Sequence, residues 1–97
     1  MQFALVCADK PRSLELRLAT RAAHLAYLQT YADKMVQAGP LLDAEGRAAG
    51  SLLIIEVADA AEAAGFAEAD PYARAGLFES VIIRAYRTVF KDGEMAT

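Results

Sequence analysis

The chain has 97 residues, which is the usual size of one domain and leaves no room for a second core. Hydrophobic residues make up 56% of the sequence, but 22 residues are Ala, so the large apolar side chains amount to about a third of it. A domain this small leaves much of its surface exposed, and we therefore expect association with a second copy.

The charges exclude two classes of partner. Ten Lys and Arg against 13 Asp and Glu give a net charge of −3, and the basic residues are scattered. Without a basic patch that could follow a phosphate backbone, we expect no nucleic-acid partner. No apolar stretch approaches the roughly 20 residues of a membrane span, and the first apolar run shows no cleavage-site pattern. The sequence therefore predicts a soluble, cytoplasmic protein.

The first 38 residues predict a strand followed by a helix. Residues 2–8 (QFALVCA) form a short apolar run, ended by Asp9-Lys10-Pro11, as is typical of a buried strand. Residues 11–38 carry apolar side chains at three- and four-residue steps and end at Gly39-Pro40, which predicts one long amphipathic helix. The stripe expected to face the core is Leu14, Leu18, Ala22, Leu25, Leu28, Ala32, Met35 and Val36.

A hairpin is predicted in the middle of the chain. Residues 40–44 are a brief strand candidate, and residues 50–58 (GSLLIIEVA) are the most strand-like segment of the sequence. Glu45-Gly46-Arg47 between them favours a turn, and Asp43 beside it is best explained as a turn residue.

The last third predicts two helices and a strand. Asp59 and Glu62 form a capping box for a helix that continues to Ala69. Asp70-Pro71 is a good N-cap followed by a good first helical residue, so a second, short helix begins there. Residues 77–90 predict a long final strand, and residues 91–97 predict a frayed tail.

This order of elements predicts an α+β fold. Two β-α-β units with right-handed crossovers give the ferredoxin-like βαββαβ arrangement, an antiparallel sheet with both helices on one face. In the third strand Leu53, Ile55 and Val57 can point to the helices, which leaves Leu52, Ile54 and Glu56 on the open side. An apolar open face usually marks an interface, so we expect a homodimer packed sheet to sheet.

His24, the one histidine, is the first candidate for chemistry. It lies on the predicted helix at the flank of the core stripe, beside Arg21, whose charge would favour the neutral imidazole that acts as a base. The alternative is a structural histidine that covers the core edge and hydrogen-bonds once. Arg21 is a candidate for binding an anionic substrate, although a solvated charge is the default for it and for Arg17, Arg84 and Arg87.

Asp70 is the second candidate. Helix capping alone explains an Asp-Pro pair. In the predicted fold, however, both helices lie on the same face, so Asp70 could approach His24 and orient the imidazole.

Other kinds of site lack the residues they need. One histidine and one cysteine cannot supply a recognisable zinc set, and no glycine-rich nucleotide motif is present, so we expect no metal and no cofactor. Cys7 lies in an apolar run, where a buried thiol without redox function is expected.

Three features together resemble the YciI family of small α/β proteins. They are His24, the segment 39–56 (GPLLDAEGRAAGSLLIIE) and the segment 70–87 (DPYARAGLFESVIIRAYR). The resemblance implies a dimeric α/β barrel of ferredoxin-like domains with an active site built on His24 and Asp70. It also implies Ser51 and Tyr72 as neighbours in the substrate pocket. One similar protein acts as a dehydrochlorinase on a chlorinated hydroxyquinol.

The leading functional hypothesis is a small cofactor-independent enzyme of lyase or isomerase type. His24 would move a proton on a small hydroxylated or anionic organic substrate, and Asp70 would orient the ring. The alternative is a non-catalytic dimeric module that binds a metabolite. A cofactor-free monooxygenase on the related barrel dimer is a third, less favoured hypothesis.

Overall fold

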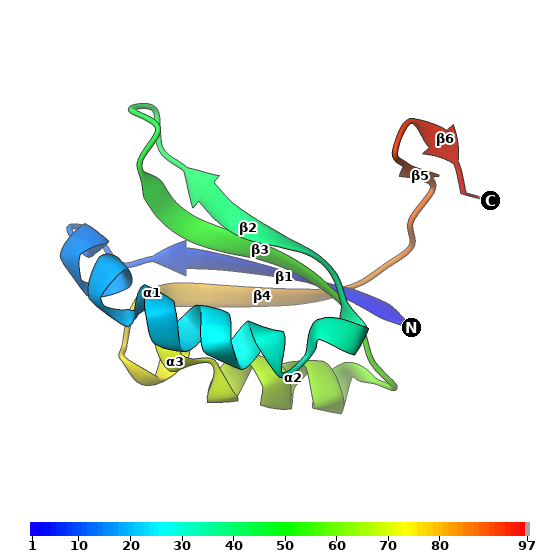
Figure 1. Ribbon diagram of the computed structural model, residues 1–97, viewed down its shortest axis with the longest axis horizontal. Helices are drawn as coiled ribbons and strands as arrows, with labels where there is room; N and C mark the ends of the chain where they lie inside the picture. The colour runs from blue at the N-terminus through cyan, green and yellow to red at the C-terminus, as the bar shows by residue number, and fades with distance from the viewer. Residues whose placement is uncertain (97) are drawn as a thin grey trace.

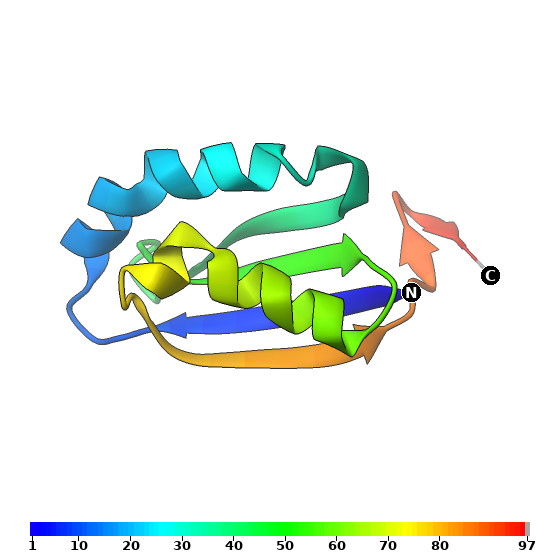
Figure 2. The same ribbon diagram turned by 90° about the horizontal axis from the view of Figure 1, so that it is seen from below.

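The computed structural model describes residues 1–96, and in it a four-stranded antiparallel sheet carries helices on one face (Figures 1 and 2). The strands lie in the order β2-β3-β1-β4. The six main elements are β1 (Gln2–Asp9), α1 (Leu14–Gln29), β2 (Met35–Leu42), β3 (Ala48–Glu56), α2 (Ala60–Ala69) and β4 (Phe78–Tyr86). This is the predicted ferredoxin-like βαββαβ arrangement, and the fold prediction is confirmed.

The first helix is shorter than the predicted helix of residues 11–38. After Gln29 the backbone N–H groups of Thr30 and Tyr31 bond three residues back, and a single 3₁₀ turn, η1 (Ala32–Lys34), follows. The chain then enters β2, whereas the expected strand covered only residues 40–44. Pairing with β3, from Met35 opposite Ile55 to Leu42 opposite Ala48, outweighs the helical periodicity of this segment.

The predicted core stripe of α1 is wrong in part, since Leu28 and Met35 pack against the core but its other leucines do not. Leu14, Leu18 and Leu25 are exposed, whereas Arg17 and His24 are the buried residues of this helix. Arg17 and His24 are seven residues apart, so they lie two turns apart on the same face. The helix turns this face inward because each polar side chain finds a carboxylate there, as described below.

The predicted caps of the second half are confirmed. Asp59 Oδ1 accepts a hydrogen bond from Glu62 N (2.9 Å), and the Glu62 side chain reaches back to Ala58 N (2.9 Å), which fixes the start of α2. Asp70 then caps the four-residue helix α3 (Pro71–Arg74). In the turn between β2 and β3, Asp43 Oδ1 accepts from the backbone N–H groups of Glu45 and Arg47, as expected for a turn residue.

The core lies between the sheet and the helices. It contains the alternate side chains of β1 and β3 that face α2, namely Phe3, Leu5, Cys7, Leu53, Ile55 and, just after β3, Val57. Phe66 of α2 packs against them. The other face of the sheet carries Val6, Leu52 and Ile82, which are between 38% and 46% exposed, so the predicted open apolar face is present.

The C-terminal strand is shorter than the predicted residues 77–90. β1, the neighbour of β4, begins at Gln2 opposite Tyr86, so no partner is left for the residues that follow. Instead of fraying from residue 91, the chain forms a small hairpin, β5 (Phe90–Lys91) and β6 (Glu94–Met95). Asp92 and Gly93 between them both have positive φ, which suits a two-residue hairpin turn. The part of the tail prediction that concerns Thr97 lies outside the described residues.

Candidate active site

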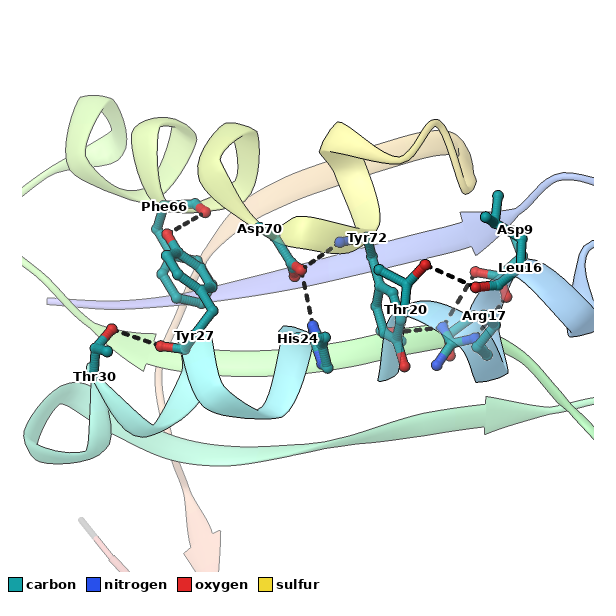
Figure 3. A network of polar contacts seen from close by, with 12 residues as sticks. Asp9, Leu16, Arg17, Thr20, His24, Tyr27, Thr30, Phe66, Asp70 and Tyr72 are labelled. Atoms are coloured by element: carbon teal, nitrogen blue, oxygen red, sulfur yellow. Dashed lines mark hydrogen bonds and ion pairs between the residues drawn. The ribbon is translucent and has the colours of Figure 1, made fainter. Parts of the chain in front are cut away.

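His24 and Asp70 meet in the space between α1 and the start of α3. His24 Nδ1 lies 2.8 Å from Asp70 Oδ1, and the two side chains are 8% and 3% exposed. Both residues belong to one chain, so the contact needs no second subunit. The expected approach of Asp70 to the flank of the first helix is therefore present in the structure (Figure 3).

Asp70 holds two groups with one oxygen. Its Oδ1 atom accepts from the backbone N–H of Tyr72 (2.9 Å), which caps α3, and also contacts His24 Nδ1. An ionised carboxylate can only accept hydrogen bonds, so the proton of a neutral imidazole belongs on Nδ1 and the lone pair on Nε2. The capping bond fixes the carboxylate, and the carboxylate in turn fixes the orientation of the ring.

The second ring nitrogen of His24 faces open space. Among residues 1–96, no fully enclosed side-chain nitrogen or oxygen lacks a hydrogen-bond partner. His24 Nε2 bonds to none of these residues, so it must lie against the cavity that His24 lines. A basic nitrogen oriented by a carboxylate and open to a cavity is the arrangement of a general base.

Arg17 forms a second buried polar group two turns before His24. Its Nε donates to Asp9 Oδ2 (2.7 Å) and its Nη2 to Asp9 Oδ1 (3.2 Å), and both side chains are 5% exposed. Nη2 also donates to Gly50 O and to Ser51 Oγ, both at 2.7 Å. Burial opposes the charge of Arg17, but the hydrogen bond and charge of Asp9, together with smaller effects of Tyr72, hold the Arg17 pKa above its usual value.

The Tyr72 ring lies between these two groups (Figure 3). It stacks on the His24 imidazole with centroids 3.9 Å apart and an interplanar angle of 15°. The Arg17 Cζ atom is 4.5 Å from the centre of the same ring. Burial raises the pKa of the Tyr72 hydroxyl, while the charges of Arg17 and Arg21 lower it by less, so the hydroxyl stays protonated at neutral pH.

A cavity of about 270 Å³ opens between α1 and the β2–β3 hairpin. His24, Arg21, Ser51 and Tyr72, all predicted as site residues, line it, and Asp70 lies behind His24. The rest of the wall consists of Arg17 and apolar residues, among them Leu18, Leu25, Leu28, Pro40 and Leu53. A larger hollow of about 400 Å³ near Lys10, Arg12 and Arg47 contains neither His24 nor Asp70, so we place the candidate site in the smaller one.

Sequence reasoning missed the role of Arg17 and Asp9. Arg17 was expected to be solvated but is only 4% exposed. Asp9, which was expected only to end the first strand, is its buried ion-pair partner. The available signal was the seven-residue spacing of Arg17 and His24, which places both on one helix face. Leu18 and Leu25 of α1 line the cavity instead of the core, whereas Leu28 contacts both.

The remaining candidates take no part in this site. Burial, followed by the charge of Asp70, raises the pKa of the Cys7 thiol to about 12, so it is protonated and unreactive at neutral pH.

Within residues 1–96, no group of three or more His, Cys, Asp or Glu side chains could hold a metal ion. The same range contains no helix with the length and hydropathy to cross a membrane.

The chain is similar to several known proteins. The model of the YCII-related domain matches residues 1–87. Protein YciI of Escherichia coli O6:H1 is 38% identical over 98 residues, which cover 93% of this chain and all of that protein. An uncharacterized protein of Haemophilus influenzae is 33% identical with the same coverage.

Two solved structures have a similar fold. One is the 5-chloro-2-hydroxyhydroquinone dehydrochlorinase of Burkholderia phenoliruptrix in complex with 2,5-dihydroxybenzoquinone. It has a TM-score of 0.86 and 37% identity, with 90% of this chain and 94% of that chain covered. The other, an antibiotic biosynthesis monooxygenase, has a TM-score of 0.52 and 10% identity over 90% of this chain and 98% of that chain, and shows the fold alone. The match over residues 1–87 and the similarity to whole relatives show that the chain belongs to the YCII-related domain family.

Proposed function

We propose that this protein is an enzyme that moves a proton on a small hydroxylated or anionic organic substrate by means of side chains alone. His24 Nε2 takes the proton, and Asp70 orients the ring and stabilises the imidazolium that forms. The observation that carries this proposal is the 2.8 Å contact between His24 Nδ1 and Asp70 Oδ1, with the other ring nitrogen open to the cavity.

The cavity suits such a substrate. Its volume of about 270 Å³ is near the lower end of ligand pockets, which favours a molecule of about one ring. Its walls are mostly apolar, and Arg17, Arg21 and Ser51 supply polar contacts. The similar dehydrochlorinase is in complex with 2,5-dihydroxybenzoquinone, a ligand of this size and chemistry, which supports the same substrate class here.

A lyase reaction on a chlorinated hydroquinone uses one base. One hydroxyl proton first moves to the ring carbon that carries the chlorine, which gives the keto tautomer of the substrate. His24 then removes the proton of the hydroxyl para to the new carbonyl, the chloride leaves with its bonding electron pair, and the ring becomes a hydroxyquinone. One HCl is lost, and no oxidant or reductant is needed. Proton transfer by a positioned base contributes about 10²- to 10⁴-fold to the rate.

The test uses the wild-type protein with 5-chloro-2-hydroxyhydroquinone under nitrogen. We expect release of chloride well above the rate in buffer, together with the absorbance of the quinone product. Deuterium uptake into the ring of the unchlorinated triol, in D₂O, measures proton transfer without a leaving group. Binding of 2,5-dihydroxybenzoquinone without acceleration of either reaction would contradict an enzyme and favour a metabolite-binding module.

We also propose that the protein is a homodimer joined through the open sheet face. Val6, Leu52 and Ile82 are apolar, exposed and adjacent on that face, and a monomer rarely leaves such a patch uncovered. Light scattering should give twice the chain mass of 10.4 kDa. Val6→Lys, which places a charge between Leu52 and Ile82 in the middle of the patch, should give the monomer mass. A wild-type protein that is monomeric at micromolar concentration contradicts this proposal.

A further inference from the structure

The Tyr72 side chain has a polar group that the proposed function does not yet use. The residue is 1% exposed, yet it lines the cavity beside His24. Its backbone N–H donates to Asp70 Oδ1, and the Arg17 guanidinium, which can only donate, hydrogen-bonds its side-chain oxygen, so among the described residues no acceptor takes its phenolic O–H. A buried O–H normally finds an acceptor, so the available one is a group in the cavity.

Two neighbours determine where the hydroxyl lies. The His24 imidazole covers one side of the Tyr72 ring at 3.9 Å, and the Arg17 guanidinium lies 4.5 Å from its centre, with the ring between them (Figure 3). Arg17 is itself held by Asp9, Gly50 O and Ser51. The ring therefore has little freedom to turn, and the O–H is preorganised.

The surroundings of the hydroxyl favour negative charge on a bound oxygen. Arg17 and Arg21 are cations on the same cavity wall. The charge of each lowers the pKa of the Tyr72 hydroxyl, which means that both favour negative charge at this place. Apolar side chains, among them Leu28 and Leu53, form much of the remaining wall and reduce screening by water. A protonated donor beside two cations in such a site stabilises an oxyanion more than it would in water.

We infer that the Tyr72 hydroxyl donates a hydrogen bond to the substrate oxygen that becomes negative when His24 removes the proton. This inference rests on the proposed function and narrows it to substrates whose deprotonation leaves charge on an oxygen, namely phenols, hydroxyquinones and enols. Tyr72 then has two roles: its ring orients the imidazole, and its O–H contacts the substrate.

Tyr72→Phe separates these two roles because it removes only the oxygen. In this variant we expect the affinity for 2,5-dihydroxybenzoquinone, which is an anion at neutral pH, to fall about 10-fold or more. Turnover of the chlorinated hydroquinone should fall about 100-fold, the effect of losing one oxyanion donor, with KM changed by less than threefold. Tyr86→Phe is the matched control, because Tyr86 is 42% exposed on β4 and lines no part of this cavity.

The imidazole signals of His24 show whether the ring stack remains. They should keep their ring-current shift in Tyr72→Phe and lose it in Tyr72→Leu, since only leucine removes the stacked ring. If Tyr72→Phe binds the anion and turns over substrate as the wild type does, the inference is wrong. Wild-type protein that does not bind the quinone anion also overturns it.

Failure of the proposed function has a different signature. If the wild type accelerates no reaction, but binds the quinone anion at least 10-fold more tightly than Tyr72→Phe does, the enzyme proposal fails and the hydrogen bond from Tyr72 is supported. The binding measurement thus tests Tyr72 independently of turnover.

Discussion

Replacement of His24 by glutamine is expected to lower turnover by about 10²- to 10⁴-fold, because the variant has no nitrogen that can accept the proton. Glutamine can still donate a side-chain N–H toward Asp70, so the buried carboxylate keeps a partner and the fold is preserved. The affinity for 2,5-dihydroxybenzoquinone should change by only a few-fold, since binding needs the cavity and its donors rather than the base. The measurement is kcat for chloride release, with thermal unfolding to verify the fold.

Asp70→Asn tests whether the carboxylate acts through His24. Asparagine is a good N-cap, so the bond to Tyr72 N and the start of α3 should survive. The uncharged amide neither enforces the Nδ1–H form of the ring nor stabilises the imidazolium, and the corresponding change in serine proteases lowers kcat about 10⁴-fold. We expect kcat to fall at least 100-fold. The double variant with His24→Gln should lose no more than His24→Gln alone, because substitutions of residues that act as one unit do not have additive effects on kcat.

The matched control for this variant is Asp59→Asn. Asp59 caps α2 as Asp70 caps α3, with an Oδ1 to N distance of 2.9 Å in both cases, but it lines no part of the cavity. Its turnover should equal that of the wild type. Either of two results would refute the assignment of base and orienting residue: His24→Gln within threefold of wild-type turnover, or equal losses in the two Asp→Asn variants.

Local patterns were sufficient for much of the fold. The apolar segments of β1 and β3 and the capping residues Asp59 and Asp70 specify structure through groups a few residues apart, and these elements agree with the prediction. The segment Met35–Leu42 is different. Its apolar residues fit a helix locally, and only its pairing with β3 makes it a strand, so a contact that local periodicity does not contain decides its structure.

The candidate site shows the same limit. The fold prediction placed both helices on one face and so allowed His24 and Asp70, 46 residues apart, to meet, as they do. The inward face of α1 could not be predicted from hydropathy, because the helix buries Arg17 and His24 and exposes Leu18 and Leu25. Burial of these polar side chains is stable only where acidic partners are already placed, and tertiary structure supplies Asp9 and Asp70.

Arg17 also carries the largest expected effect on stability. We expect Arg17→Met to lower the free energy of unfolding by about 3–5 kcal/mol, because it leaves the Asp9 carboxylate buried without its partner. It also removes the hydrogen-bond donor to two buried acceptors, Gly50 O and Ser51 Oγ. A domain of this size is typically stable by about 5–15 kcal/mol, so much of the margin would be lost.

Chemical denaturation of three further variants isolates the cause of that loss. Arg47→Met is the matched control, since Arg47 pairs with Asp43 at 3.4 Å but is 61% exposed, and exposed pairs contribute about 0–1 kcal/mol. Asp9→Leu alone leaves the Arg17 charge unpaired and should also be strongly destabilised. The double variant Asp9→Leu, Arg17→Met leaves no buried charge and should be more stable than either single variant. Additive losses in the double variant would mean that the two side chains stabilise the fold separately rather than as a pair.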